Sequence, residues 1–127
     1  MKGRLALAIE KGEIAFITGA SSGLGAEFAR QLASRGYNLI LTSRREERLR
    51  LLAASIHTVH PVEIQIQPAD LSKNADIDLL ASLISSLPRL DLLVNNAGFG
   101  TVGKFYRVDP EKELAMLNVH ITAMVML

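Results

Sequence analysis

The sequence has no cysteine among its 127 residues. This absence excludes internal disulfides, thiolate metal sites and a cysteine nucleophile. A strong charge of either sign is also missing, because the formal net charge is only +1. Composition therefore gives no reason to expect a nucleic acid or a membrane surface as a partner.

Long apolar runs are missing as well. The apolar run from Leu5 to Ile9 is too short for the core of a signal peptide, and Glu10 and Lys11 follow it. Elsewhere, charges or glycines interrupt each apolar stretch well before the roughly 20 residues that a membrane-spanning helix needs. We therefore expect a cytoplasmic protein with no membrane partner.

Hydrophobic residues make up 49% of the chain, which can supply the core of one domain. Short apolar runs rich in β-branched residues alternate with longer stretches of helical periodicity. These runs predict strands at 14–18, 38–42, 62–67 and 91–94. The alternation predicts βαβ units and therefore a parallel sheet.

Helical periodicity predicts the elements between the strands. The spacing of Leu24, Phe28, Leu32 and Ala33 predicts a helix over about 23–35. A charged helix is expected after residue 45, and another over about 74–86.

A last helix is predicted to begin at Asp109, Pro110 and Glu111, which supply an N-cap, a first-turn proline and an acid at the positive end of the helix dipole. No stop signal follows, so we expect this helix to continue to the C-terminus. Its apolar residues crowd more than one face, which predicts that it packs against partners outside this chain.

Three glycines lie between the first strand and the first helix, in the segment Thr18-Gly-Ala-Ser-Ser-Gly-Leu-Gly25. In this place the backbone amides and the helix dipole together favour a phosphate. Gly19 would allow a tight turn, Gly23 would let backbone approach a pyrophosphate, and Gly25 would bring helix and strand close. Each glycine alone could be an ordinary turn residue, but the three together favour pyrophosphate binding.

The pattern Thr-Gly-x-x-x-Gly-x-Gly, followed by Asn-Asn-Ala-Gly from Asn95 to Gly98, resembles the short-chain dehydrogenase/reductase family. The resemblance covers residues from about 13 to 127. We expect an α/β fold of the Rossmann type, a doubly wound parallel sheet with its four strands in the order 3-2-1-4. Residues 1–127 would form one dinucleotide-binding domain.

The resemblance also assigns residues to the parts of a dinucleotide. The pyrophosphate turn would comprise Gly19, Ser21, Ser22, Gly23, Leu24 and Gly25. Asp70 and Leu71 would contact the adenine edge, although Asp70 alone would more often be a helix-entry cap or a solvated acid. The segment after the fourth strand would lie against the adenosine ribose, through Asn95, Ala97 and Gly98.

The end of the second strand bears on the choice between NAD and NADP(H). An enzyme that selects NAD usually has an acid there, which binds the ribose 2′-hydroxyl. This chain has Ser43 instead, and the Arg44 guanidinium beside it offers several donors to a 2′-phosphate. We therefore predict NADP(H) as cofactor, with Arg45 assisting. The charges from Glu46 to Arg48 are interpreted as the solvated first turn of a helix.

Hydride transfer to a carbonyl also needs a proton donor. The resemblance implies a Ser, a Tyr and a Lys four residues after the Tyr, assisted by an Asn that Asn118 matches. Tyr37 and Tyr106 are followed four residues on by Leu41 and Pro110, so neither begins Tyr-x-x-x-Lys. In the family the other three residues come later in the chain. We therefore expect a truncated form of a longer reductase, inactive by itself.

Two classes of function stay open. The first is an NADP(H)-dependent oxidoreductase that interconverts a carbonyl and an alcohol on a small-molecule substrate, as a homo-oligomer by analogy with the family. The second is a non-catalytic nucleotide-binding or interaction module that lacks the Ser, Tyr and Lys set. Sugar, steroid, acyl and polyol substrates are all compatible with the sequence. For His120, an ordinary surface or core role is favoured over catalysis.

Overall fold

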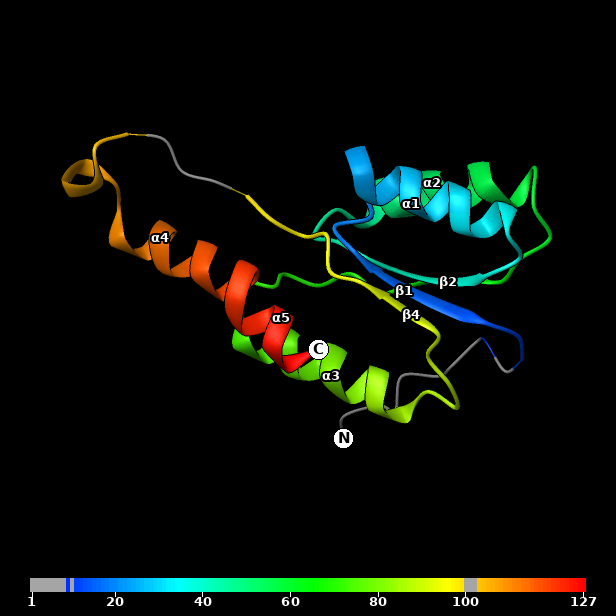
Figure 1. Ribbon diagram of the computed structural model, residues 1–127. Coiled ribbons are helices and arrows are strands. Elements are labelled where there is room, and N and C mark those ends of the chain that lie inside the picture. Colours follow the sequence, from blue (N-terminus) through cyan, green and yellow to red (C-terminus); the bar gives the residue numbers. More distant parts are fainter. Residues whose placement is uncertain (1–8, 10, 100–102) are drawn as a thin grey trace.

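Four parallel strands form one sheet in the order β3-β2-β1-β4 (Figure 1). The computed structural model describes residues 9, 11–99 and 103–127. The strands are β1 (Ile14–Thr18), β2 (Asn38–Thr42), β3 (Ile64–Ile66) and β4 (Leu92–Val94). The Rossmann-type sheet and its strand order are thus confirmed, although β3 and β4 are shorter than predicted. Most of the apolar run from Leu5 lies outside the described residues.

Strand β1 lies at the centre of the sheet and is buried along its whole length. Its side chains alternate between two apolar clusters, as the period of a strand requires. Ala15 and Ile17 pack in one cluster, and Ile14 and Phe16 pack in the other. A strand covered on both faces needs apolar residues at consecutive positions, which explains the unbroken run in the sequence.

Helices cover both faces of the sheet (Figure 1). Helices α1 (Gly23–Ser34) and α2 (Glu46–His57) supply the cluster on one face. The other face is covered by α3 (Asn74–Ser86) and, at the end of the chain, by α5 (Ala123–Met126). This arrangement is the doubly wound architecture that the sequence predicts.

The buried face of α1 differs from the one that its larger apolar residues indicate. Leu24 is 70% exposed and Phe28 is 43% exposed. The buried residues are Gly25, Ala26, Ala29, Leu32 and Ala33. A Cβ atom on Gly25 would lie only 2.1 Å from the carbonyl oxygen of Gly19. This close approach fixes the rotation of α1, so that small residues meet the sheet and Leu24 points away from it.

The C-terminal helix continues to Met126 as the sequence predicts, but a π-helical turn interrupts its regular α-helical pattern. A short 3₁₀ helix η1 (Phe105–Arg107) precedes α4 (Pro110–Leu117), a π-helical turn η2 (Asn118–Thr122) follows, and α5 completes the segment. Its predicted start is confirmed, because the Asp109 carboxylate accepts a hydrogen bond of 2.9 Å from the Glu111 amide. The extra residue in the π turn changes the direction of the side chains that follow it.

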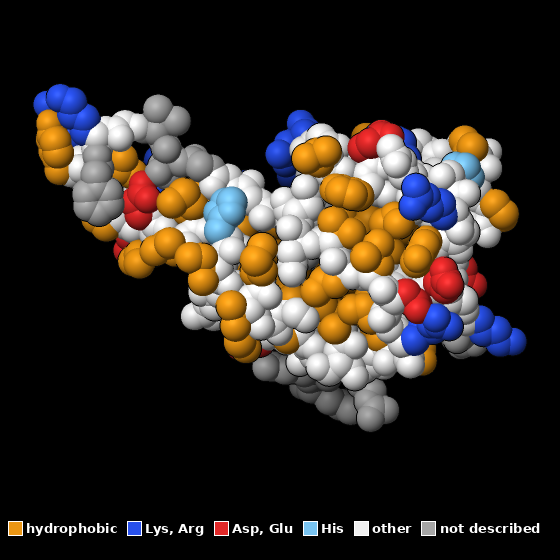
Figure 2. Space-filling model, in the orientation of Figure 1, with side chains coloured by type: hydrophobic (Ala, Val, Ile, Leu, Met, Phe, Trp, Pro, Cys, Tyr) orange, Lys and Arg blue, Asp and Glu red, His pale blue; other side chains and the backbone are white. Residues whose placement is uncertain are grey.

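Large apolar side chains are exposed along this segment (Figure 2). They are Leu114, Leu117, Ile121, Met124, Val125 and Met126. Helix α4 extends beyond the edge of the sheet in Figure 1. None of the helices in the described ranges is both long and apolar enough to cross a membrane.

Asp91 joins the starts of the two strands β1 and β4. Its carboxylate accepts a hydrogen bond of 2.8 Å from the Ile14 amide and is paired with the guanidinium of Arg89. The hydrogen bonds from Arg89, followed by the one from Ile14, lower the pKa of Asp91 below its ordinary value. The folded protein therefore favours the ionised carboxylate.

We expect Asp91→Asn to lower the free energy of unfolding at pH 7. Because the pKa of Asp91 is lower in the folded protein, its ionised form stabilises the fold above the unfolded-chain value of about 3.9. This contribution is lost as the pH falls through the lower, folded-state value. Urea unfolding should therefore show a difference between variant and parent that shrinks as the pH falls toward about 3.

Asp78→Asn on the exposed side of α3 is the matched control, since it removes the same charge without these hydrogen bonds. The control should unfold like the parent at every pH. An Asp91→Asn effect that stays constant across the pH range would contradict this role for the carboxylate.

Candidate functional site

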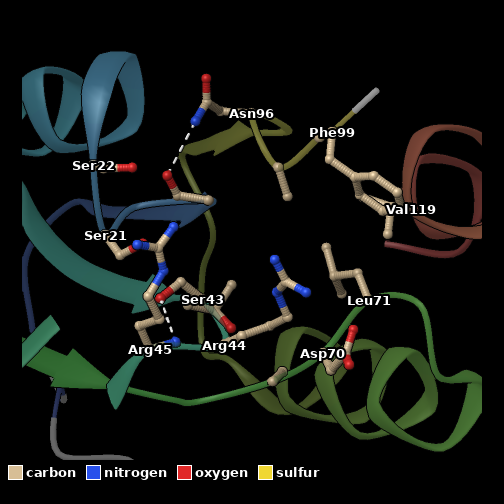
Figure 3. A pocket seen from close by; sticks show the side chains of 15 residues that line it. Ser21, Ser22, Ser43, Arg44, Arg45, Asp70, Leu71, Asn96, Phe99 and Val119 are labelled. Carbon is tan, nitrogen blue, oxygen red and sulfur yellow. Dashed lines mark hydrogen bonds between the residues drawn. The ribbon is translucent and has the colours of Figure 1, made fainter. Parts of the chain in front are cut away.

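A cavity of about 230 Å³ opens at the carboxyl ends of the strands (Figure 3). Its walls come from the segments that follow the four strands and from one residue of η2. The lining residues are Gly19, Ser21, Ser22, Thr42, Ser43, Arg44, Arg45, Ala69, Asp70, Leu71, Asn96, Ala97, Gly98, Phe99 and Val119. The chain connections diverge on either side of β1, and ligands of open α/β sheets bind at such a point.

The loop after β1 brings a helix N-terminus to the cavity. Gly19 has a φ of +63° and Gly23 a φ of +58°, both in the left-handed region that favours glycine. A Cβ atom on Gly19 would also lie 2.8 Å from the Cα of Ala97. Ser22 stands at the N-cap of α1 without a side-chain capping bond, and the first turn contains no acid. The first amides of α1 and the positive end of its dipole are therefore available to an anion.

Thr18 fastens the loop after β4 to the end of β1. Its buried Oγ1 accepts hydrogen bonds of 3.0 Å from the amides of Asn96 and Ala97, and donates one of 3.4 Å to the carbonyl of Val94. The side-chain amide of Asn96 donates a further bond of 3.2 Å to the carbonyl of Gly19 (Figure 3). One threonine and one asparagine thus hold two walls of the cavity together.

The segment after β2 carries two arginines at the cavity. The hydroxyl of Ser43 accepts a hydrogen bond of 3.2 Å from the backbone amide of Arg45. In Figure 3 the Arg45 guanidinium lies on the side of Ser21, and that of Arg44 lies on the side of Leu71. Both residues are exposed. Within the described part of the chain neither guanidinium has a hydrogen bond or an ion pair.

Asp70 borders the cavity after β3 and also organises the entry to α3. Its carboxylate accepts hydrogen bonds from the amide and the hydroxyl of Ser72, at 3.0 and 2.7 Å. Burial raises the pKa of Asp70, but the bonds from Ser72 and the positive charges of Arg44 and Lys73 outweigh burial and lower it. Asp70 therefore has the contacts of a turn-forming acid and still lines the cavity.

The structure brings most of the predicted cofactor residues to one cavity. Those that line it are Gly19, Ser21, Ser22, Ser43, Arg44, Asp70, Leu71, Ala97 and Gly98. The others are Gly23, Leu24, Gly25 and Asn95, which lie outside the lining. Gly25 shapes the loop from behind through its contact with Gly19, whereas Leu24 is exposed.

Some lining residues were not singled out by sequence reasoning. Thr42 and Ala69 adjoin predicted residues, and Asn96 lies inside the Asn-Asn-Ala-Gly motif. No motif in the sequence marks Phe99 or Val119 as a cavity residue. Phe99 reaches the cavity because of the path of the loop after β4, and Val119 because of the π turn.

Asn118, the predicted catalytic asparagine, lies behind the cavity wall. Its side-chain amide donates a hydrogen bond of 3.2 Å to the carbonyl of Leu71. It is half-buried and does not line the cavity. Among the residues that the structure describes, no group of three or more His, Asp or Glu could hold a metal ion.

A glycine loop at a helix N-terminus, set at the divergence point of a parallel sheet, defines a Rossmann-type nucleotide-binding fold. The sequence profile of the short chain dehydrogenase family matches residues 13–127. The chain belongs to this family, and the resemblance found in its sequence is confirmed.

Known proteins that resemble this chain include reductases of different substrates. The chain is 43% identical over 91 residues to a very-long-chain 3-oxoacyl-CoA reductase of Scheffersomyces stipitis, a match that covers 70% of this chain and 26% of that protein. The chain thus spans about a quarter of the length of this curated relative.

Solved structures share the fold over most of this chain. A short-chain dehydrogenase of Sphingobium yanoikuyae in complex with NADPH matches with a TM-score of 0.86 and 33% identity, over 90% of this chain and 44% of that one. L-sorbose reductase of Gluconobacter frateurii, in complex with NADPH and L-sorbose, matches with a TM-score of 0.83 and 32% identity, over 91% of this chain and 44% of that one.

We expect Thr18→Val to lower the free energy of unfolding by about 2 kcal/mol, because it removes the acceptor of two backbone amides. Thr42→Val is the matched control. Within the described residues the buried Oγ1 of Thr42 has no hydrogen-bond partner, so its removal should leave stability unchanged or raise it. Urea unfolding of the ligand-free variants measures both effects. Equal losses in the two variants would contradict the role given to Thr18.

Proposed function

We propose that this chain is the cofactor-binding part of an NADP(H)-dependent short-chain oxidoreductase that interconverts a carbonyl and an alcohol by hydride transfer. One observation carries the proposal. The glycine loop at the N-terminus of α1 and the arginines after β2 line the same cavity. A helix N-terminus and two guanidinium groups without hydrogen bonds to the described residues suit a ligand that carries several phosphates.

The residues present fit such a nucleotide. Gly19 and Gly25 let the turn pack closely against the loop after β4 and against α1, since a Cβ atom would lie 2.8 Å from the Ala97 Cα at position 19 and 2.1 Å from the Gly19 carbonyl oxygen at position 25. Thr42 borders the cavity with a buried hydroxyl that has no partner among the described residues, so a polar ligand group could satisfy it. On this proposal the amides around Gly19 to Gly25 bind the pyrophosphate, with Ser21 and Ser22 beside them.

The preference for NADP(H) over NAD(H) rests on the end of β2. Ser43 stands where a carboxylate would repel a 2′-phosphate, and the guanidinium groups of Arg44 and Arg45 have no hydrogen bond or ion pair with any residue that the structure describes. Each hydrogen bond to a charged group contributes about 1.5–3 kcal/mol, which corresponds to roughly a ten- to hundredfold preference. NADPH in the related structures of Sphingobium yanoikuyae and Gluconobacter frateurii supports the same choice.

The remaining walls would hold the adenosine. We propose that Asp70 and Leu71 contact the adenine edge and that the segment from Asn95 to Gly98 contacts the ribose. Leu71 is a buried apolar residue, and Asp70 is an acid on which the positive charge of Arg44 acts. The two neighbours would therefore offer the adenine one apolar and one charged contact. Asn96 lines the cavity and joins this segment to Gly19.

In reduction, a bound nicotinamide would supply the hydride and the carbonyl oxygen would need a proton donor; in oxidation of the alcohol, the same group would have to accept the proton. Neither Tyr37 nor Tyr106 is followed by a lysine four residues on. We propose that the 127-residue chain binds NADP(H) without turnover, and that Asn118 contributes to catalysis only in combination with a Ser, Tyr and Lys set. The substrate is proposed as a small-molecule carbonyl or alcohol.

A non-catalytic nucleotide-binding or interaction module is the second candidate. The exposed apolar side chains of α4, η2 and α5 also suit a protein contact, and we propose a homo-oligomer.

We expect Arg44→Ala to raise the dissociation constant for NADPH about tenfold or more, because the 2′-phosphate loses a charged donor. The dissociation constant for NADH should change much less. Fluorescence titration of both nucleotides at one ionic strength measures the difference. Arg48→Ala, which removes the same charge from the exposed side of α2, should leave both affinities near those of the parent. Equal losses for NADPH and NADH would reject the assignment of Arg44.

We expect the 127-residue chain to bind NADPH but not to oxidise it in the presence of aldehydes and ketones, because it lacks the proton donor. A longer form that includes Tyr-x-x-x-Lys should do both if the protein is an oxidoreductase. Binding without turnover in every form would support the non-catalytic module. Turnover by the 127-residue chain would contradict our account of the missing donor.

A further inference from the structure

The π-helical turn η2 directs three consecutive residues to different parts of the cavity wall. Asn118 donates a hydrogen bond of 3.2 Å to the carbonyl of Leu71. Val119 lines the cavity itself. His120 contacts the backbone of Phe99, which also lines the cavity. One turn therefore touches both the loop after β3 and the loop after β4, and π turns within helices often occur at functional sites.

The contact of His120 with the loop after β4 is specific. Its Nε2 lies 3.0 Å from the amide nitrogen of Phe99 and 2.7 Å from the carbonyl oxygen of the same residue. Nε2 can accept from the amide or donate to the carbonyl, depending on the tautomer, but it cannot do both at once. In either state the imidazole holds Phe99, whose ring is tilted 54° to its own at a centroid distance of 6.4 Å.

The neighbouring glycine is shaped to the same imidazole. A Cβ atom on Gly98 would lie 2.5 Å from Cε1 of His120, so a side chain at position 98 would displace the imidazole from its place. Gly98 does not have a positive φ, so space for the imidazole, and not backbone conformation, requires glycine here. The loop is thus held at one end by Thr18, through Asn96 and Ala97, and at the other end by His120.

We propose that His120 is a positioning residue that fixes Gly98 and Phe99 in the cavity wall and so raises the affinity for nucleotide. This inference rests on the proposed NADP(H) site. His120 is itself exposed, and the groups that it holds line the cavity. Its loss should therefore affect the shape of the wall more than the stability of the fold.

The test compares His120→Ala with His120→Gln, whose side-chain amide can reach the place of Nε2. His120→Ala should raise the dissociation constant for NADPH about tenfold, the equivalent of one lost hydrogen bond, with a nearly unchanged urea midpoint. His120→Gln should recover most of the affinity. His57→Ala, which removes an exposed imidazole at the end of α2, is the matched control and should bind like the parent.

A second variant addresses the steric part of the contact. Gly98→Ala should weaken NADPH binding in the parent, since its methyl group meets the imidazole. The same substitution should cost much less affinity in the His120→Ala background, where that obstacle is gone. Additive losses in this double-mutant cycle would overturn the proposed contact. If His120→Ala fails to fold, the test rests on Gly98→Ala, which should weaken NADPH binding, and on His120→Gln, which should bind nearly like the parent.

Amide hydrogen exchange of the ligand-free protein gives a readout that does not depend on the nucleotide. In ¹⁵N-labelled protein the Phe99 amide should exchange about tenfold faster in His120→Ala than in the parent or in His120→Gln. Unchanged exchange together with unchanged NADPH affinity would overturn the positioning role, whereas unchanged exchange with weakened binding would show that Nε2 donates to the Phe99 carbonyl instead. If the parent fails to bind NADPH but the exchange difference is present, the proposed function is rejected, and so is the increase in nucleotide affinity attributed to His120. The contact of His120 with Phe99 would still be supported. Equal NADPH affinity of parent and His120→Ala would reject the inference alone.

Discussion

The contact of Gly25 with the backbone of Gly19 is the constraint on which the rest of the cavity depends. A Cβ atom on Gly25, in the first turn of α1, would lie 2.1 Å from the carbonyl oxygen of Gly19. The helix must therefore present its small residues to the sheet. The uncapped N-terminus of α1 then points into the cavity between β1 and β4. A larger residue at position 25 would move the helix, its free amides and the turn at Gly19 together.

The same constraint explains what the sequence could and could not predict. Unbroken apolar runs identified β1 and β2, because strands buried on both faces have no other pattern. Hydrophobic periodicity placed Leu24 and Phe28 on the buried face of α1, but both are exposed. Periodicity identifies large apolar residues, whereas α1 packs closely at a position that has no side chain, Gly25. It also failed to predict the π turn, because no glycine or proline marks residues 118–122.

The candidate site was predictable to the extent that its residues belong to short motifs. The glycine loop, Ser43 and Arg44 follow strands that the sequence indicates clearly, so their meeting at one edge of the sheet follows from the topology. Which member of a motif faces the cavity depends on the local path of the backbone. The backbone amide of Asn96 donates to Thr18, and its side chain, and not that of Asn95, then reaches the carbonyl of Gly19. The sequence does not distinguish these two asparagines. The place of His120 beside Gly98 likewise needs the π turn, which brings distant parts of the chain together.

The charges around the cavity favour an elongated anion over a single phosphate. One positive region is the N-terminus of α1, and the other is formed by Arg44 and Arg45 after β2. The one acid in the lining, Asp70, is engaged by Ser72 and faces Arg44, so its charge is partly compensated before any ligand enters. A single phosphate would engage only some of these donors, whereas a ligand with several anionic groups could engage the helix N-terminus and both arginines. The presence of both kinds of donor at one cavity, more than either alone, supports the proposed NADP(H) site.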